Sequence, residues 1–413
     1  MAATVWSAVA DRLNWSIVDL DLVMTASTAL PPVVMFGSAR PVTCAVLDYS
    51  RRLVDAINAQ RPNTAEIRLI DPNRPAAFVG AIVEVLKQDR IVHFQLPIEG
   101  WGNSLIPGSA LFAARALTRR GKIMITLHEW TSLNHLRYLS TVPDVLAADG
   151  FIFVSQQQRE AFLSTPLVGR AKKDAAPVIM IGPNIMPKRI DPAAVAKERQ
   201  AILGQGALAA ECVIGFFGVL YASKRPELLL RTLRALHERG KRARLLICGD
   251  FLWDKPQERE AFFDVARALQ VMPWLDFRGR IDDEAALMAT LSAVDVFLLP
   301  YSDGISTRRG SFQAISPLAI PLVSTTPERA DEFAQSPLLQ SKVYNPATVL
   351  RAPDASAECF ADAVLEALAN TRHAVGVDLA GLWVEGAAAH LRAYAALQRA
   401  RFQNHNKVMS PAE

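Results

Sequence analysis

The segment CVIGFFGVLYASKRPELLLRTLRALHERGKRARLLICGD, residues 212–250, decides the fold class. The apolar run Cys212–Phe217 predicts a buried strand, and Pro226–Arg239 predicts a helix that ends at Gly240. A second apolar run, Leu245–Cys248, predicts the next strand. Uninterrupted apolar strands that are separated by a helix are typical of a parallel sheet with helices on both faces. We therefore expect a βαβ unit here.

The same alternation continues in both directions along the chain. Downstream, the sequence predicts helices over Lys255–Leu269 and Asp282–Leu291 and a strand over Asp295–Leu299. Upstream, Val42–Gln60 and Ala76–Lys87 have helical patterns. The upstream apolar runs that predict strands are Val33–Phe36, Ile67–Ile70, Ile91–Phe94, Ile123–Leu127, Phe151–Val154 and Pro177–Ile181. The chain therefore reads as two doubly wound α/β domains that are joined near residues 182–192.

These patterns predict domain boundaries. We expect an N-terminal Rossmann-like domain over residues 1–185, in which residues 1–30 form an extension that we cannot place, and a second Rossmann-like domain over 186–378. Residues 379–413 should form a helix, over Leu379–Phe402, that returns across the junction, followed by a tail. Ligands of such sheets bind at the carboxyl ends of the strands, which predicts a cleft between the two domains.

Composition excludes several classes of protein. Of 413 residues, 51% are hydrophobic and 21% charged, which excludes a disordered chain, a disulfide scaffold and a coiled coil. The net charge of +4 argues against a dedicated nucleic-acid binder but allows a local anion site or weak attraction to acidic lipids. The four cysteines lack metal-ligand spacing and fit a reducing compartment. The longest uncharged stretch, Leu22–Ala39, is too polar to span a bilayer. We expect a cytoplasmic protein.

Polar residues that follow the predicted strands mark candidate sites. His128 and Glu129 follow Ile123–Leu127 in the first domain. In the second domain, Gly218 lets the backbone approach a ligand, and Lys224 lies at the start of the next helix, where anions are favoured.

A second candidate anion site follows Asp295–Leu299. The loop over residues 301–311 contains several hydroxyls and both Arg308 and Arg309, and Gly310 and Ser311 open the next helical run. Two anion sites in one domain and a His-Glu pair in the other suit a phosphorylated substrate.

In motif order, the chain resembles the retaining glycosyltransferases of family 4, which have the GT-B fold. The resemblance covers about residues 32–402. Thr126–Glu129 resembles the strand-ending His-Asp motif, whose histidine lies at the donor sugar. Gly218–Lys224 resembles the loop that holds the donor diphosphate. The other matching segments are Ile91–Gln95, Phe153–Ser155, Ile181–Asn184, Leu246–Gly249, Phe277–Ile281 and the Trp383 region.

The chain departs from the family pattern at the usual pair of glutamates. Ser306 and Ala314 stand where the family carries these two carboxylates, and Val219 replaces a usual arginine. Residues 303–311, DGISTRRGS, instead resemble a subgroup with Asp-Gly-x-Ser-x-Arg-Arg-Gly-Ser. Pro317 lies where the family helix continues, so we expect an early end or a kink there.

The resemblance implies a transferase that moves a sugar from a nucleoside-diphosphate sugar to a saccharide or lipid-linked acceptor, in polysaccharide, lipopolysaccharide or glycolipid assembly. It implies no metal cofactor and no nucleic acid, and allows a peripheral contact with the inner membrane. His128 and Glu129 would be catalytic. Diphosphate would bind at Gly218, Lys224, Arg308, Arg309, Gly310 and Ser311. The sugar or nucleoside would bind at Asn184, Gly249, Arg280, Ile281, Asp303, Gly304 and Ser306.

Two other functions stay open at this point. The missing carboxylates are compatible with a non-catalytic binding or regulatory protein of the same shape. A sugar-nucleotide epimerase of the same fold is a third reading. Asp19-Leu20-Asp21 has the form of a metal-nucleotide motif from a different glycosyltransferase fold, but lies outside the predicted sheets.

Overall fold

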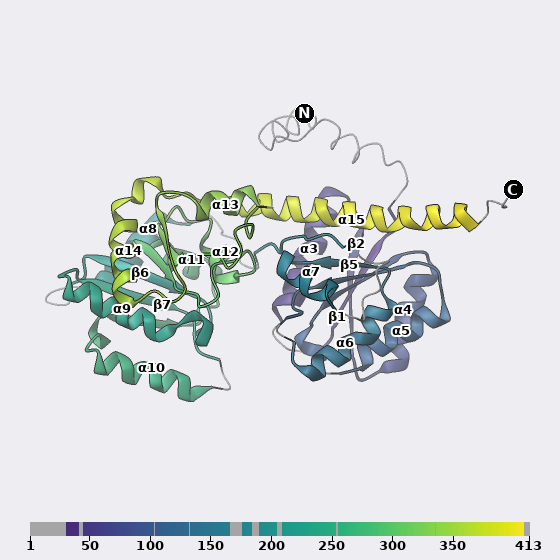
Figure 1. The fold of residues 1–413 in the computed structure, drawn as a ribbon, viewed down its shortest axis with the longest axis horizontal. Coiled ribbons are helices and arrows are strands. Elements are labelled where there is room, and N and C mark those ends of the chain that lie inside the picture. The colour runs from purple at the N-terminus through teal and green to yellow at the C-terminus, as the bar shows by residue number, and fades with distance from the viewer. Residues whose placement is uncertain are drawn as a thin grey trace, which may run out of the picture. The chain divides into compact units, whose positions relative to one another are not determined.

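The computed structural model describes residues 30–40, 44–102, 104–131, 133–165, 176–183, 190–204, 209–252, 255–334 and 336–408, with side chains up to residue 399. These residues form two compact α/β units (Figure 1). Unit 1 contains the described residues up to Ile179 and those from Val384 on, and unit 2 contains Met180–Trp383. The N-terminal extension, Asp19-Leu20-Asp21 and Asn184 lie outside the described residues.

Unit 1 is built on a five-stranded parallel sheet with the strand order β2-β1-β3-β4-β5. Its strands are nearly continuous apolar runs, as expected for a sheet that is covered on both faces. Their bounds are β1 Val33–Ser38, β2 Ala65–Ile70, β3 Ile91–Leu96, β4 Lys122–Leu127 and β5 Gly150–Phe153.

Helices cover both faces of this sheet. Helices α4 (Pro75–Lys87), α5 (Ile106–Leu117) and α6 (His135–Ala147) pack side by side in that order. Helix α3 (Ala45–Gln60) packs on β1, β2 and β3. The remaining helical elements are η1 (Glu99–Trp101), α7 (Gln156–Leu163) and the long C-terminal helix α15 (Leu379–Val408), shown in yellow in Figure 1.

Unit 2 contains a six-stranded parallel sheet with the order β11-β10-β9-β6-β7-β8. The strands are β6 Cys212–Phe217, β7 Ala243–Cys248, β8 Leu275–Gly279, β9 Val296–Leu299, β10 Leu322–Thr325 and β11 Thr348–Arg351. The helical elements are α8 Pro192–Leu203, η4 Ala222–Lys224, α9 Pro226–Glu238, α10 Pro256–Ala268, η5 Met272–Trp274, α11 Glu284–Ser292, α12 Gly310–Ile315, α13 Pro337–Val343, α14 Ala357–Ala369 and η6 Thr371–His373. The expected βαβ unit at residues 212–250 is present.

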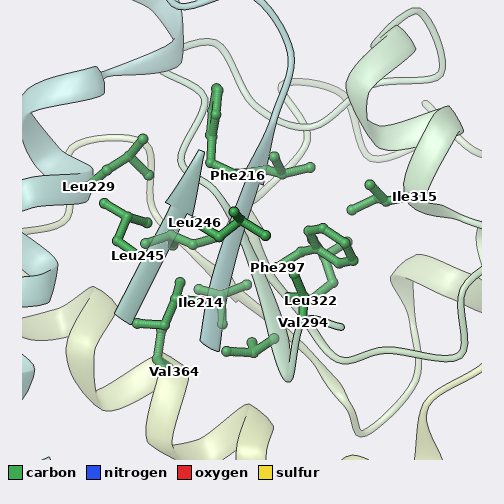
Figure 2. Close-up of a cluster of buried hydrophobic side chains, with 14 of the residues drawn as sticks. Ile214, Phe216, Leu229, Leu245, Leu246, Val294, Phe297, Ile315, Leu322 and Val364 are labelled. Atoms are coloured by element: carbon green, nitrogen blue, oxygen red, sulfur yellow. The ribbon is translucent and has the colours of Figure 1, made fainter. Parts of the chain in front are cut away.

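The core of unit 2 lies between this sheet and its helices. Ile214 and Leu245 are fully buried side chains from neighbouring strands, and Leu229 of α9 and Val364 of α14 are buried in the same cluster (Figure 2). Burial stabilises the fold by roughly 25 cal/mol for each Å² of apolar surface that is removed from water. This cluster therefore holds in place the sheet whose strand ends carry the candidate site.

One predicted strand is absent, and one predicted helix end is confirmed. Pro177–Ile181 does not form a strand: among the described residues it makes only a parallel bridge from Val178 to Phe153. The run is apolar, but only its centre pairs with the edge strand β5. Helix α12 ends at Ile315, directly before Ser316 and Pro317, which confirms the early end expected at that proline.

Trp383, in the last segment of unit 2, packs on Gly182 and Pro183. The indole nitrogen of Trp383 donates to the Pro183 carbonyl at 3.2 Å, and a Cβ on Gly182 would lie 2.5 Å from the Trp383 ring. Only glycine therefore allows the chain to pass against this indole. None of the described helices combines the length and apolar character that a membrane span needs.

Candidate functional site

A row of glycines lines the carboxyl edge of the unit 2 sheet. Gly218, Gly249 and Gly279 stand at the ends of β6, β7 and β8 with φ values of 120°, 151° and 64°. A Cβ on Gly249 would lie 2.0 Å from the Gly218 carbonyl oxygen, so the two backbones touch. This edge consequently presents backbone rather than side chains, which allows a ligand to come close.

Lys224 lies at this edge as a buried cation. It is the last residue of the short helix η4 and is only 4% exposed. Its Nζ donates to Ser311 Oγ at 2.5 Å, and a Cβ on Gly218 would meet the same hydroxyl at 2.6 Å. The structure thus brings Gly218 and Lys224, from one loop, together with Ser311, which is distant in sequence.

Aromatic rings take the place of a carboxylate beside Lys224. Its ammonium lies 4.5 Å from the centre of the Tyr301 ring and 5.8 Å from that of Tyr221. The Arg309 guanidinium lies 4.7 Å from the same Tyr301 ring and is ion-paired with Asp303. Tyr301 is fully buried. Its face attracts both cations, which would otherwise repel each other.

The electrostatics of this site favour an incoming anion. Burial, with a smaller contribution from the nearby charge of Arg309, lowers the pKa of Lys224 to about 7, whereas the charge of Asp303 opposes the shift. A negatively charged group beside Lys224 would compensate the buried charge and raise that pKa again. Within the described ranges, no group of three or more His, Cys, Asp or Glu side chains could hold a metal ion.

The loop between β9 and α12 is held by contacts that the sequence did not reveal. Glu332 Oε1 accepts hydrogen bonds from the backbone N–H and the hydroxyl of Thr307, both at 2.8 Å. A Cβ on Gly304 would lie 2.5 Å from the Thr326 carbonyl oxygen, so this position requires glycine. These contacts fix the loop that carries Arg309.

The other predicted residues of unit 2 occupy different surroundings. Arg308 and Ser306 are partly buried in the same loop, and Gly310 begins α12 with open space around its Cα. Arg280 is exposed and paired with Asp282 at 2.6 Å. Ile281 follows β8, partly buried against the core of unit 2. Arg225, beside Lys224, donates to the carbonyls of Pro353 and Ala355, which makes it a structural residue.

In unit 1, His128 lies at the end of β4, where it is 8% exposed. Its backbone N–H donates to the Leu96 carbonyl at 2.8 Å, and its ring packs edge-on against Tyr49. Its Nε2 lies 2.8 Å from Gln95 Oε1. Because an amide oxygen only accepts, Nε2 carries the proton and Nδ1 keeps its lone pair. Glu129 is exposed directly beside it.

The contact to Gln95 is part of a buried polar network that reaches helix α15. His93 Nε2 lies 3.3 Å from Gln95 Nε2 and 2.8 Å from Thr126 Oγ1. His93 Nδ1 then donates to the Tyr394 hydroxyl at 2.7 Å. The network therefore orients His128 through neutral hydrogen bonds, with the C-terminal helix as its far anchor.

Burial keeps the histidines of this network neutral. It lowers the pKa of His128 to about 3 and that of His390, also on α15, to about 4; the proximity of His390 contributes to the shift of His128. The pKa of His93 is also well below its usual range, because of burial and of both other histidines.

These pKa values predict a pH dependence of stability. Below about pH 6.5 the unfolded chain takes up protons at these histidines, but the folded chain does not. The free energy of unfolding should therefore fall as the pH is lowered from 7 to 5, by up to about 1.4 kcal/mol per pH unit for each histidine. Urea unfolding across this range measures the slope. His390→Leu should make it shallower, and the exposed-site variant His135→Ala should not; a flat profile in the wild type would contradict this account.

A family model and several solved structures resemble this protein. A family model described as glycosyl transferases group 1 matches residues 211–370, within unit 2. HepE from Anabaena, solved in complex with UDP, has a TM-score of 0.57 at 14% identity, and the match covers 91% of this chain and 100% of that chain. No curated protein sequence matches.

The protein has the GT-B fold. A glycosyltransferase from Rickettsia africae gives a TM-score of 0.59 at 13% identity, covering 93% of this chain and 100% of that one. The lipopolysaccharide outer core galactosyltransferase WaaB, in its apo form, gives 0.58 at 13% identity, covering 88% and 99%. With the group 1 match in unit 2, this GT-B protein is a glycosyltransferase-type enzyme.

In this GT-B enzyme, Gly218, Lys224, Arg309 and Ser311 lie together, and Gly249 adjoins them through the backbone of Gly218. Sequence reasoning missed the residues that organise the site, which are Gln95, Tyr221, Tyr301 and Glu332. Tyr221 and Tyr301 occur in the segments that were singled out, where an aromatic residue beside a lysine was an available signal. Gln95 is the polar residue that ends the matched segment Ile91–Gln95, but its contact with His128 could not be read from the sequence. Glu332 had no local signal, because its partner Thr307 belongs to a distant loop.

Proposed function

We propose that this enzyme belongs to the family 4 subgroup with the Asp-Gly-x-Ser-x-Arg-Arg-Gly-Ser motif and transfers a sugar from a nucleoside-diphosphate sugar with retention of anomeric configuration. The observation that carries the proposal is the meeting of Lys224, Ser311 and Gly218 beside Arg309. This group lies within the range that matches the glycosyl transferases group 1 model. The structural neighbour HepE, whose complexes contain UDP and UDP-glucose, supports such a donor.

The proposed acceptor is a saccharide or a lipid-linked saccharide in polysaccharide, lipopolysaccharide or glycolipid assembly. The galactosyltransferase WaaB, a structural neighbour named for the lipopolysaccharide outer core, supports that class. A peripheral contact with the inner membrane would be compatible with a lipid-linked acceptor.

In the proposed reaction, the bond between the anomeric carbon and the terminal phosphate oxygen breaks as an acceptor hydroxyl oxygen bonds to that carbon, and the hydroxyl proton passes to the departing phosphate oxygen. The leaving diphosphate gains negative charge, so stabilising it is the main task of the protein. Lys224 and the Ser311 hydroxyl would face this charge, and Arg309 would exchange its ion pair with Asp303 for one with phosphate. These side-chain cations would serve without a metal.

His128 and Glu129 would act on the sugars. We propose that His128 orients a hydroxyl of the donor sugar through its unprotonated Nδ1, because Gln95 engages its Nε2. A neutral imidazole suits this role, since the lowered pKa of His128 leaves it able to accept a hydrogen bond at neutral pH. Glu129 would face the acceptor. Gly249, Arg280, Ile281, Asp303, Gly304 and Ser306 remain the proposed contacts of sugar and nucleoside, and Asn184 stays a prediction.

Lys224→Ala tests the diphosphate role. Loss of this ammonium should lower kcat/KM for a UDP-sugar at least tenfold, because the leaving group loses its buried countercharge. The matched control is Lys255→Ala, which removes an exposed lysine paired with Glu258 in the same unit and should keep the wild-type rate. Transfer by Lys224→Ala at the wild-type rate would exclude the assignment. If the wild-type protein binds UDP but transfers no sugar, the result would instead indicate a binding protein.

His128→Ala separates the sugar-side role from diphosphate binding. It should lower kcat by an order of magnitude or more and leave the affinity for UDP unchanged, because His128 contacts the sugar in this proposal. His135→Ala, on the exposed start of α6, is the control. Product analysis without acceptor belongs to the same assay, since release of an epimerised nucleotide sugar would show the epimerase function instead.

A further inference from the structure

Tyr301 lies at the carboxyl end of β9, where the sheet fixes its position. Its side chain is fully buried. Its backbone N–H donates to the Leu299 carbonyl at 3.0 Å, and its carbonyl accepts the Thr325 hydroxyl at 2.8 Å. Thr325 ends the neighbouring strand β10 and is itself fully buried. The place of the Tyr301 ring is therefore set by two strands and not by the loop that follows.

Two cations from separate segments lie over this ring. The Lys224 ammonium, from η4, is 4.5 Å from the ring centre, and the Arg309 guanidinium, from the loop before α12, is 4.7 Å from it. Arg309 Nη1 also donates to the Tyr221 hydroxyl at 3.4 Å. The negative face of an aromatic ring attracts cations, and more strongly where water is excluded. Tyr301 therefore gives both cations the same buried, uncharged partner.

The Tyr301 hydroxyl does not explain why a tyrosine is buried here. It has no hydrogen-bond partner among the described residues. Burial raises its pKa above the usual range, so the group stays protonated and uncharged. Because an unsatisfied buried hydroxyl lowers the free energy of unfolding, this group is a cost to the fold. The part of the side chain with a favourable contact to Lys224 and Arg309 is the ring.

An aromatic ring acts on the two cations differently from a carboxylate. A buried carboxylate would neutralise them and compete with an incoming anion. The carboxylate that does pair with Arg309, that of Asp303, is 49% exposed, so water weakens this ion pair and an anion can replace it. The ring of Tyr301 holds Lys224 and Arg309 close together and leaves the charge of each available.

We propose that Tyr301 is a positioning residue of the anion site, in which the ring, and not the hydroxyl, holds Lys224 and Arg309 together so that both can bind one diphosphate. The diphosphate rests on the proposed function, whereas the pairing of the two cations on the ring does not. Tyr301 would touch neither the donor nor the reacting atoms. It would act through the two cations, because binding an anion then does not have to bring like charges together.

Tyr301→Phe and Tyr301→Leu separate the ring from the hydroxyl. Tyr301→Phe is the conservative variant that keeps the ring, so it should bind UDP nearly as tightly as the wild type and unfold with an equal or higher free energy. Tyr301→Leu should weaken UDP binding at least tenfold. Since the ring also stabilises the ammonium form of Lys224, the affinity of Tyr301→Leu should begin to fall at a lower pH. Calorimetric titration with UDP between pH 6 and 9 measures both effects.

Fluorinated phenylalanines at position 301 test the ring even if Tyr301→Leu fails to fold. One, two and then three ring fluorines withdraw charge from the ring face with little change of volume, so each added fluorine should weaken UDP binding further. The same series at Phe297 is the matched control. Phe297 is buried in β9 (Figure 2), and among the described residues no cation lies over its ring. Affinity there should not follow the number of fluorines.

The results that would overturn the proposal are specific. They are an affinity for UDP that falls as far in Tyr301→Phe as in Tyr301→Leu, an unchanged affinity in Tyr301→Leu, or an affinity that ignores the fluorines at position 301. Sugar transfer by the wild type together with any of these results would refute the role of Tyr301 alone. A ring-dependent affinity for UDP in a protein that transfers no sugar would uphold the positioning role and refute the proposed function.

Discussion

The candidate donor site depends on one buried ammonium group. Lys224 is almost fully enclosed, and it contacts the Ser311 hydroxyl and the rings of Tyr301 and Tyr221 rather than a carboxylate. Removing a lysine from water without an ionic partner is unfavourable, and its lowered pKa expresses that cost. An anion beside Lys224 would supply the countercharge that this ammonium group needs. The glycine edge formed by Gly218 and Gly249 leaves room for an anion to approach.

In unit 1, the buried hydrogen-bond network orients the imidazole of His128 and leaves it neutral. His128 lies at the end of a chain of neutral hydrogen bonds through Gln95 and His93 to Tyr394. Each member of the chain is buried, so exchanging its hydrogen bonds for water requires opening the packing between the sheet and α15. The C-terminal helix thus does more than complete the fold, because it anchors the network that sets the tautomer of His128.

The sequence predicted the fold well because most strands and helices are determined by the residues within them. Apolar strands such as Cys212–Phe217 and helices such as Pro226–Glu238 each follow from their own composition, and Pro317 correctly predicted the end of α12. Pro177–Ile181 failed because composition does not tell whether an apolar run finds a full partner strand. At the site, Lys224 was recognised from its place after a strand, but Tyr301 and Glu332 act through contacts between distant segments. The meeting of Lys224 and Arg309 on the Tyr301 ring is likewise visible only in the folded chain.

The central claim is that Lys224 binds the diphosphate of a nucleotide donor. Calorimetric titration with UDP, in buffers of different ionisation enthalpy, measures protons taken up on binding. With a pKa of about 7, most Lys224 is neutral at pH 8, and a bound diphosphate would raise this pKa. We predict an uptake approaching one proton at pH 8, an affinity that falls as the pH rises from 7 to 9, and loss of both effects in Lys224→Ala. Binding of UDP without proton uptake, or uptake that persists in Lys224→Ala, would contradict the account.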